Sequence, residues 1–321
     1  MNDILKIEHL TKHFVKKGLF SSKSSIVKAA DDVSFSLHEG EVFVLAGESG
    51  SGKSTIARLI MKAIEANSGK IIFEGDEIGN DTQSLTKIRM SCQMVHQDPY
   101  DSINPRMRVF DIVSEPLEIH KVGNKEERYK RVIEALREVR LEPPEEIAQK
   151  FPHALSGGQR QRIVLARALV LKPKVIIADE PVSMLDVSIR AEVLELMAEL
   201  QKKYKISFIY ITHDLATARH FGDRIAILYL GKIVEMGPID KVLLRPKHPY
   251  TQALIDALSE PDPKNLYKEK QIRINEPLDI DVYQGCRFRA RCPYAIEECK
   301  DEPTLKDIGD GRDVACFVKL D

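Results

Sequence analysis

LSGGQ, at Leu155–Gln159, lies between GESGSGKS at Gly47–Ser54 and VIIADE at Val175–Glu180. The glycines of GESGSGKS let a loop turn its backbone N–H groups onto phosphate oxygens, and Lys53 can reach the β and γ phosphates. The glycines of LSGGQ open a helix, whose free N–H groups and positive end form a second site for an anion. The three stretches together predict a protein that binds a nucleotide through its phosphates.

GESGSGKS supplies most of the predicted nucleotide contacts. The buried strand VFVLAG runs directly into this loop, and the helix expected over Lys53–Ala66 begins at the phosphates. Since all eight positions of the pattern match after a buried strand, we favour this function over a chance glycine loop. The predicted contacts are Gly47, Glu48, Ser49, Gly50, Ser51, Gly52, Lys53, Ser54 and Thr55, with Thr55 at the α phosphate.

VIIADE ends on two carboxylates. Asp179 follows a short apolar run and would hold Mg²⁺ through water. Glu180 comes just past the predicted end of the strand, where a carboxylate can orient or deprotonate the attacking water. An isolated apolar-Asp-Glu run is usually a strand that meets a polar loop. Its position after LSGGQ favours the catalytic interpretation.

The order of these motifs, with Gln97 between the first two and His213 after the third, resembles the ATP-binding cassette (ABC) ATPases over nearly the whole chain. The resemblance implies that Gln97 contacts Mg²⁺ or water and that His213 touches the γ phosphate and positions the water. It also implies a head-to-tail dimer with two ATP molecules at the interface. In that dimer the γ phosphate held by the other cassette would be met by Ser156, Gly157, Gly158 and Gln159.

The resemblance also assigns metal ligands and catalytic groups. The implied Mg²⁺ ligands are Ser54, Gln97 and Asp179. The implied catalytic residues are Glu180, His213 and Gln97. Phe14 is the candidate to stack on the adenine ring, although His13 and Phe20 are nearby.

The remaining pattern predicts an α/β fold with two subdomains. Alternation in ILKIEHLTKHF and VSFSLHEGEVFVLAG predicts antiparallel strands, and the βαβ rhythm of VIIAD and ISFIYIT predicts a mostly parallel sheet. Helical periodicity near Lys125–Val139 places a helical subdomain at about 98–172. We expect a P-loop ABC cassette over 1–236, a linker with a short helix over 237–269 and a small Cys-rich module over 270–321.

Composition limits the classes of partner and the compartment that we expect for the protein. The 48 Lys and Arg residues balance 49 Asp and Glu, so the net charge of -1 offers no field for nucleic acid or an anionic membrane. The longest apolar runs, such as IAILYL, fall short of the roughly 18–20 residues needed to cross a bilayer. The N-terminal stretch has no apolar export segment, so we expect the protein to stay in the cytoplasm.

A closer resemblance, to the ATP-binding subunits of oligopeptide and dipeptide importers, is carried by QDPYDSINPRM, FPHALSGGQRQRIVLARAL, DEPVSMLDVSIRAEV, YLGKIVEMG, HPYTQAL and the KKGLF insertion at Lys16–Phe20. It implies a second, homologous ATPase subunit, two membrane permease subunits and an external solute-binding protein, at the cytoplasmic face of the membrane. Members of this family also import oligosaccharides, nickel and glutathione, so the cargo stays open. The rival class is a soluble ABC ATPase of ribosomes or DNA, but this chain has one uninterrupted cassette and no basic patch.

Four of the five cysteines, Cys286, Cys292, Cys299 and Cys316, lie close together in the sequence. Clustered cysteines in a cytosolic protein are more often metal ligands than disulfides, and four thiolates satisfy tetrahedral zinc or a cubane cluster. The intervening arginines, Arg287, Arg289 and Arg291, could offset an anionic cluster or be solvated. GCRFRARCPYAIEEC followed by VAC resembles the C-terminal motif of the oligopeptide importer ATPases, which implies a structural [4Fe-4S] cluster. Zinc, disulfides and free thiols are the alternatives.

Overall fold

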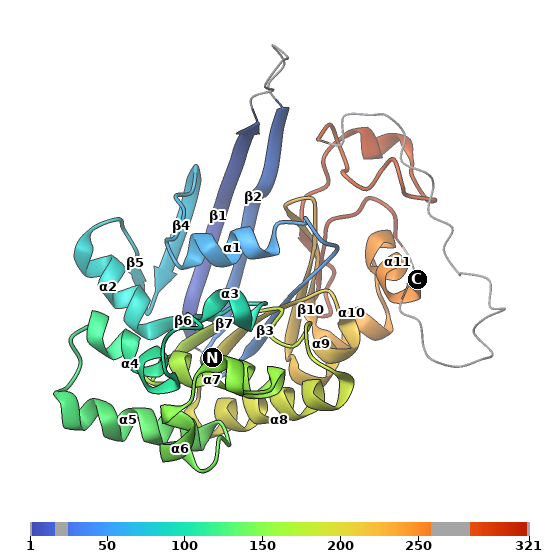
Figure 1. The fold of residues 1–321 in the computed structure, drawn as a ribbon. Coiled ribbons are helices and arrows are strands. Elements are labelled where there is room, and N and C mark those ends of the chain that lie inside the picture. The colour runs from blue at the N-terminus through green and yellow to red at the C-terminus, as the bar shows by residue number, and fades with distance from the viewer. Residues whose placement is uncertain (1, 17–24, 258–282, 320–321) are drawn as a thin grey trace.

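The computed structural model describes residues 2–16, 25–257 and 283–319, which form two sheets and a group of helices (Figure 1). The strands are β1 (Asp3–Lys16), β2 (Ser25–His38), β3 (Val42–Ala46), β4 (Ser68–Phe73), β5 (Asp76–Glu77), β6 (Cys92–Val95), β7 (Val175–Asp179), β8 (Ser207–Thr212), β9 (Arg224–Tyr229), β10 (Lys232–Pro238), β11 (Lys306–Asp307) and β12 (Asp313–Val314). The helices are α1 (Lys53–Ile60), α2 (Thr82–Ser91), α3 (Pro99–Ser102), α4 (Val109–Ile119), α5 (Lys125–Glu138), α6 (Pro144–Gln149), α7 (Gly157–Leu169), α8 (Val187–Tyr204), α9 (Leu215–Phe221), α10 (Ile239–Leu244) and α11 (Pro249–Asp256).

The larger sheet has the order β11-β12-β10-β9-β3-β8-β7-β6, and the smaller one has the order β2-β1-β4-β5. Neighbouring strands are parallel from β9 to β6 and antiparallel where β10, β12 and β11 continue the sheet. All pairs in the smaller sheet are antiparallel. The expected α/β fold, with a mostly parallel sheet and an antiparallel β subdomain, is therefore confirmed.

β3 lies at the centre of the larger sheet and is buried along its whole length. Val42 and Val44 belong to the core shared with the helices, whereas Phe43 and Leu45 belong to the core shared with the smaller sheet. A strand that is covered on both faces needs apolar residues at every position, because successive side chains point in opposite directions. This explains why VFVLA is apolar throughout.

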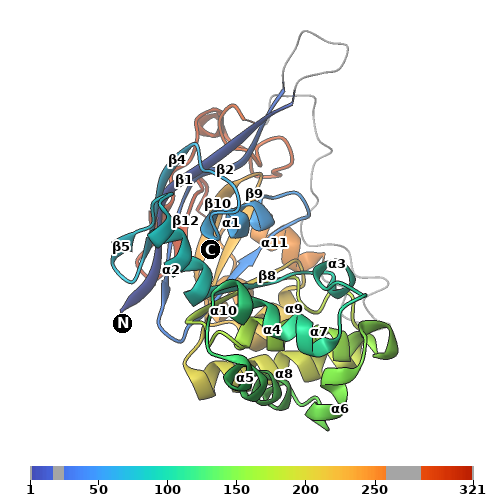
Figure 2. The same ribbon diagram turned by 60° about the vertical axis from the view of Figure 1, so that its left-hand side comes forward.

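The helices α3 to α7 gather on one side of the larger sheet, with α7 packed against α3, α4 and α5 (Figure 2). α5 covers the stretch expected to be helical, and it begins with a capping box in which Asn124 and Glu127 satisfy each other's backbone N–H groups. Within the described ranges, no helix combines the length and the apolar character that a membrane crossing requires.

The expected length of the helix after the glycine loop is wrong. α1 ends at Ile60 rather than at Ala66. The chain turns at Lys62, which adopts a φ of 51°, and the Ala63 N–H donates to the Arg58 carbonyl. This six-to-one bond around a left-handed residue terminates helices, and it usually occurs at glycine. Because lysine stands at that position, the sequence carries no stop signal there.

The C-terminal segment reaches the edge of the larger sheet. β12 pairs antiparallel with β10, so that Val314 lies opposite Glu235 and Asp313 lies opposite Met236. α11 supplies the short helix expected between the cassette and the Cys-rich module. The expected module boundary near residue 270 and the KKGLF insertion beyond Lys16 lie outside the described residues, and the three-part division of the chain stays a prediction.

Candidate functional site

The loop Gly47–Ser54 connects β3 to α1 and depends on its glycines. Gly47 has a φ of 152° and Gly52 has a φ of 109°, conformations that other residues rarely adopt. A Cβ atom on Gly47 would clash with the Leu228 carbonyl oxygen, and one on Gly52 would clash with that of Ala29. Conformation and close backbone packing therefore both require glycine at these two positions.

Lys53 is buried at the start of α1, inside the curve of the loop. Its ammonium group donates hydrogen bonds to the carbonyl oxygens of Gly47 at 2.8 Å and Glu48 at 2.9 Å. Burial lowers the pKa of Lys53, and the nearby carboxylates of Glu180 and Asp179 oppose that shift. The ammonium is thus held where incoming phosphate oxygens could replace its carbonyl partners.

Ser54 and Asp179 meet where α1 begins and β7 ends, and their side chains are hydrogen-bonded. Burial raises the pKa of Asp179, and the negative charge of Glu180 adds to the rise, while the Ser54 hydroxyl opposes it. A hydroxyl and a carboxylate beside a phosphate loop are oxygen ligands of the kind that Mg²⁺ takes together with nucleotide phosphates. The two residues fit the predicted magnesium position, and the third predicted ligand, Gln97, contacts Glu180.

Gln97 and His213 converge on Glu180. Gln97 Nε2 donates to Glu180 Oε2 at 3.1 Å, and His213 Nδ1 lies 3.1 Å from Glu180 Oε1. Gln97 follows β6 and His213 follows β8, the two neighbours of β7 in the sheet, and the carboxyl ends of parallel strands meet at one edge. The structure therefore brings together the three residues predicted to be catalytic.

Glu180 is held in a sparsely populated conformation. Its φ is 48°, and its N–H donates to the Ile211 carbonyl at 2.9 Å. Such strain persists only where the surroundings fix it, and it is concentrated at functional sites. The Glu180 side chain is 15% exposed and that of His213 is 58% exposed. A fixed carboxylate next to an accessible imidazole can accept a proton from a bound water molecule.

α7 begins within the LSGGQ stretch, at Gly157. Ser156 caps the helix, and its Oγ accepts from the Gln159 N–H at 3.2 Å, while the Gln159 side chain accepts from the Ser156 N–H at 3.0 Å. A Cβ atom on Gly158 would lie 2.6 Å from the Ile189 side chain. The amide of Gln159 therefore completes a capping box, and Gly158 allows α7 to approach α8 closely.

Phe14 lies on β1 and is partly exposed, with the Lys12 ammonium 5.3 Å from the centre of its ring. Aromatic faces attract cations and also stack on bases. Its predicted contact with adenine stays a prediction, as do the nucleotide contacts of the loop and of α7.

Two residues that the sequence interpretation did not assign to the site contact the glycine loop. The Tyr250 hydroxyl accepts from the Glu48 N–H at 2.9 Å, and Arg291 forms an ion pair with the Glu48 carboxylate at 3.1 Å. Tyr250 belongs to HPYTQAL and Arg291 lies between two of the clustered cysteines. Each residue belongs to a motif noted in the sequence, but no local pattern predicts its contact with a loop some 200 residues away.

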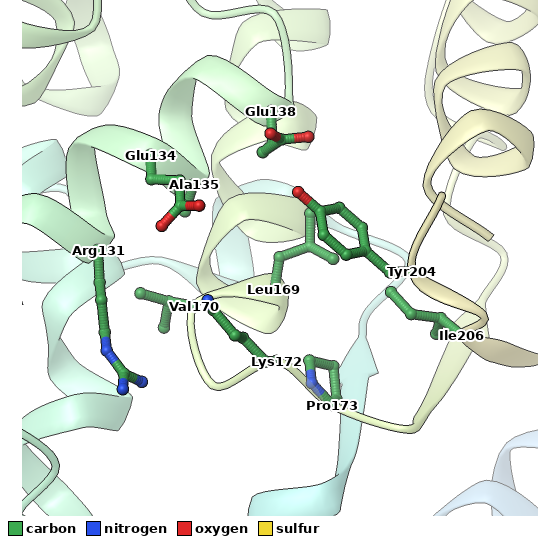
Figure 3. Close-up of a pocket in the computed structure, with 10 residues that line it drawn as sticks. All are labelled: Arg131, Glu134, Ala135, Glu138, Leu169, Val170, Lys172, Pro173, Tyr204 and Ile206. Carbon is green, nitrogen blue, oxygen red and sulfur yellow. The ribbon is translucent and has the colours of Figure 1, made fainter. Parts of the chain in front are cut away.

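A cavity lies between α5, the end of α7 and the end of α8 (Figure 3). A Lys203–Glu138 ion pair of 2.7 Å joins α8 to α5 beside it. None of the residues predicted for nucleotide, metal or catalysis lines this cavity. The lining residues are Arg131, Glu134, Ala135, Glu138, Leu169, Val170, Lys172, Pro173, Tyr204 and Ile206.

The cysteine cluster differs from the predicted metal site. Burial raises the pKa of Cys286 and of Cys292 to about 11 each, and the neighbouring thiols add to both shifts. In the described parts of the chain, no three or more His, Cys, Asp or Glu side chains are grouped so that they could hold a metal ion. The structure therefore does not support the predicted iron–sulfur cluster or its zinc alternative.

Two family models match the chain. Residues 30–183 match the model described as ABC transporter, and residues 234–299 match the model described as oligopeptide/dipeptide transporter, C-terminal region. The di/tripeptide transport ATP-binding protein DppF of Pseudomonas aeruginosa is 43% identical over 98% of both chains. The oligopeptide transport ATP-binding protein AppF of Bacillus subtilis is 42% identical over 98% of this chain and 97% of AppF.

Solved structures of ABC proteins share the fold. Clostridium perfringens cbiO1, part of the ABC transporter complex cbiONQ, superposes with a TM-score of 0.66 at 29% identity, over 76% of this chain and 92% of cbiO1. The dimeric ATP-binding cassette MJ0796 in its post-hydrolysis state, bound to ADP and Pi, superposes with a TM-score of 0.63 at 31% identity. That match covers 73% of this chain and 98% of MJ0796.

Proposed function

Because the chain belongs to the ABC transporter ATP-binding proteins of the oligopeptide/dipeptide type, we propose that it hydrolyses ATP to drive peptide import through membrane partners. The observation that carries the ATPase role is the convergence of Gln97 and His213 on Glu180, at the sheet edge that also holds the phosphate loop. The peptide cargo is supported by the match of residues 234–299 and by the names of DppF and AppF.

The positions of these residues support a mechanism of hydrolysis. The loop and Lys53 bind the phosphates. Ser54, Gln97 and Asp179 would hold Mg²⁺, which would neutralise charge on the phosphates. Glu180 accepts a proton from water as the water oxygen attacks the γ phosphorus, and the bond to the leaving oxygen of ADP breaks. His213 orients the water and contacts the γ phosphate. The products are ADP and phosphate.

The active form is a head-to-tail dimer with a second, homologous ATPase subunit. Ser156 to Gln159 of this chain face the ATP held by the partner subunit, and the dimeric state of the similar cassette MJ0796 supports this arrangement. Met184 and Val187, just after Glu180, are 63% and 81% exposed. Exposed apolar side chains beside a catalytic carboxylate suit an interface with a partner chain.

The remaining partners are two membrane permease subunits and an external solute-binding protein, with this chain at the cytoplasmic face of the membrane. Residues 98–107, which follow Gln97, are the segment proposed to contact the permeases. Closure of the two cassettes on ATP would move the permeases, and hydrolysis would reset them.

The cargo can be identified by measuring which molecules stimulate ATP hydrolysis by the complete transporter. In a complex of this chain with its ATPase partner, permeases and binding protein in lipid, we expect di- and oligopeptides to stimulate ATP hydrolysis, because loaded binding protein favours the closed state of the cassettes. The measurement is phosphate release with each candidate cargo at equal concentration. The matched control is the same complex with the binding protein omitted.

Other outcomes point to the alternatives. Stimulation by oligosaccharides, nickel or glutathione alone would contradict the peptide cargo and leave the ATPase role intact. Copurification of the chain with ribosomes through a high-salt wash would instead favour the soluble, non-transport class of ABC ATPase.

The [4Fe-4S] cluster remains only a proposal for the cysteine segment. It is supported by the composition of the ligand set and by the mutual effect of the thiols, since Cys299, Cys316 and Cys292 each raise the pKa of Cys286.

Purification without oxygen tests the cluster. We expect a brown protein that absorbs near ~400 nm and contains iron and sulfide in roughly equal amounts. Replacing Cys299 with Ser should remove the iron, whereas replacing the isolated Cys92 should not. A colourless protein with thiols that react with a thiol reagent would contradict the cluster, and one zinc per chain would favour the alternative metal.

A further inference from the structure

The segment that carries the cysteines is packed firmly against the cassette. The buried ring of Phe288 lies 5.4 Å from that of Tyr229 and 5.5 Å from that of Tyr250, measured between ring centres. Arg287 is buried and donates to the Leu230 carbonyl, and it also forms an ion pair with Asp31. Aromatic packing and a buried guanidinium fix this segment beside the β9–β10 turn.

Arg291 extends from this segment to the phosphate loop. Its two terminal nitrogens each lie 3.1 Å from a different oxygen of the Glu48 carboxylate, which is the bidentate geometry of a guanidinium–carboxylate pair. The guanidinium also donates to the Tyr229 hydroxyl at 3.3 Å and lies 5.7 Å from the centre of the Phe288 ring. Four contacts thus fix its position relative to Glu48.

Glu48 is held through its backbone as well. Its N–H donates to the buried hydroxyl of Tyr250, at the start of α11. α11 is itself capped by His248, whose Nδ1 accepts from the Tyr250 N–H at 3.0 Å. The HPY residues therefore place one hydroxyl against the phosphate loop, while Arg291 holds the side chain of the same loop residue.

The charge of Glu48 matters because it lies in a loop that must receive a polyphosphate. The Lys53 ammonium already donates to the carbonyl oxygen of Glu48 at 2.9 Å, so this residue is next to the proposed phosphate position. A free carboxylate there would repel the phosphates and compete with them for Lys53. The ion pair with Arg291 offsets this negative charge and holds the carboxylate in place.

We propose that Arg291 is a positioning residue of the ATP site, which neutralises Glu48 and fixes its side chain so that the phosphate loop accepts Mg-ATP. This inference rests on the proposed ATP-binding function and adds the cysteine segment to the ATP site. It assigns a role to one of the three arginines between Cys286 and Cys292, whatever those cysteines bind.

A charge-rescue series on the full chain tests the proposal. Arg291→Ala should raise the dissociation constant for Mg-ATP about fivefold at low salt, the size expected for one uncompensated charge near the phosphates. The double variant Glu48→Gln, Arg291→Ala should bind Mg-ATP as tightly as Glu48→Gln alone, because the repelling charge is gone. The loss should shrink at high salt. Arg291→Lys should bind Mg-ATP with intermediate affinity, since lysine keeps the positive charge but cannot form the bidentate pair with the Glu48 carboxylate.

Arg289→Ala is the matched control. Arg289 lies in the same segment, and its guanidinium makes no hydrogen bond or ion pair with the residues that the structure describes. The Arg289→Ala variant should therefore bind Mg-ATP with the affinity of the wild-type chain. The unfolding temperature of each variant should be measured without nucleotide, to show that the variant is folded. An unchanged dissociation constant in Arg291→Ala, or a loss that Glu48→Gln does not restore, would overturn the proposal, and the second result would indicate a merely structural role. Failure of the wild-type chain to bind Mg-ATP would overturn the proposed function itself.

Discussion

Glu180→Gln is expected to bind Mg-ATP with nearly unchanged affinity and to hydrolyse it about 10²–10⁴-fold more slowly. Glutamine keeps the shape of the side chain and its reach towards Gln97 and His213, but an amide cannot accept the proton of the attacking water. The phosphate loop is not altered, so the variant should accumulate in the ATP-bound dimer. The measurements are kcat at saturating ATP, the dissociation constant for Mg-ATP, and the mass of the ATP-bound species by sedimentation.

The control for this prediction is Glu195→Gln, which removes the charge of an exposed carboxylate on α8, away from the site. Its turnover should equal that of the wild-type protein. If Glu180→Gln retained more than about a tenth of the wild-type kcat, Glu180 would not be the group that accepts the proton of the attacking water.

Lys53→Ala is expected to weaken Mg-ATP binding about 10- to 100-fold, the range for a lost hydrogen bond between charged groups. The ammonium lies inside the loop, where it bonds the carbonyl oxygens of Gly47 and Glu48 before any phosphate arrives. Its removal therefore leaves those two carbonyl oxygens pointing at an anion. Equilibrium binding of a fluorescent ATP analogue, with competition by ATP, measures the effect.

Thermal unfolding separates binding from folding in this variant. Wild-type protein should gain stability when Mg-ATP is added, since a ligand that binds only the folded state raises the unfolding temperature. Lys53→Ala should lose that gain while its unfolding temperature without nucleotide changes little. Lys202→Ala, on the exposed surface of α8, should keep it. A full nucleotide-dependent gain in Lys53→Ala would contradict the proposed role of Lys53.

The phosphate loop and the parallel sheet could be predicted from the sequence because both are encoded locally. Glycines at fixed spacing after a buried strand determine the loop, and a run such as VFVLA indicates a strand that is covered on both faces. The meeting of Gln97, Glu180 and His213 then follows from strand order, since each residue comes just after one of three adjacent parallel strands.

Other features depend on contacts between distant segments. The end of α1 is set by a lysine in a conformation that glycine usually adopts, so the helical pattern continued past the true boundary. β11 and β12 are two residues long each, too short for any periodicity, and they exist because β10 offers a free edge. The contact between Arg291 and Glu48 spans 243 residues of sequence and has no local signal.

The pairing of β12 with β10 also sets an order of events during synthesis on the ribosome. β10 pairs with β9 on one side as soon as both have emerged, but its other edge stays open until Val314 has been made. At typical elongation rates that delay is on the order of 10 s. For that time the nascent chain presents the unpaired edge of a mostly buried strand, which invites pairing with other chains. Ribosome stalling between Pro238 and Val314 would therefore leave a nascent cassette that depends on chaperones.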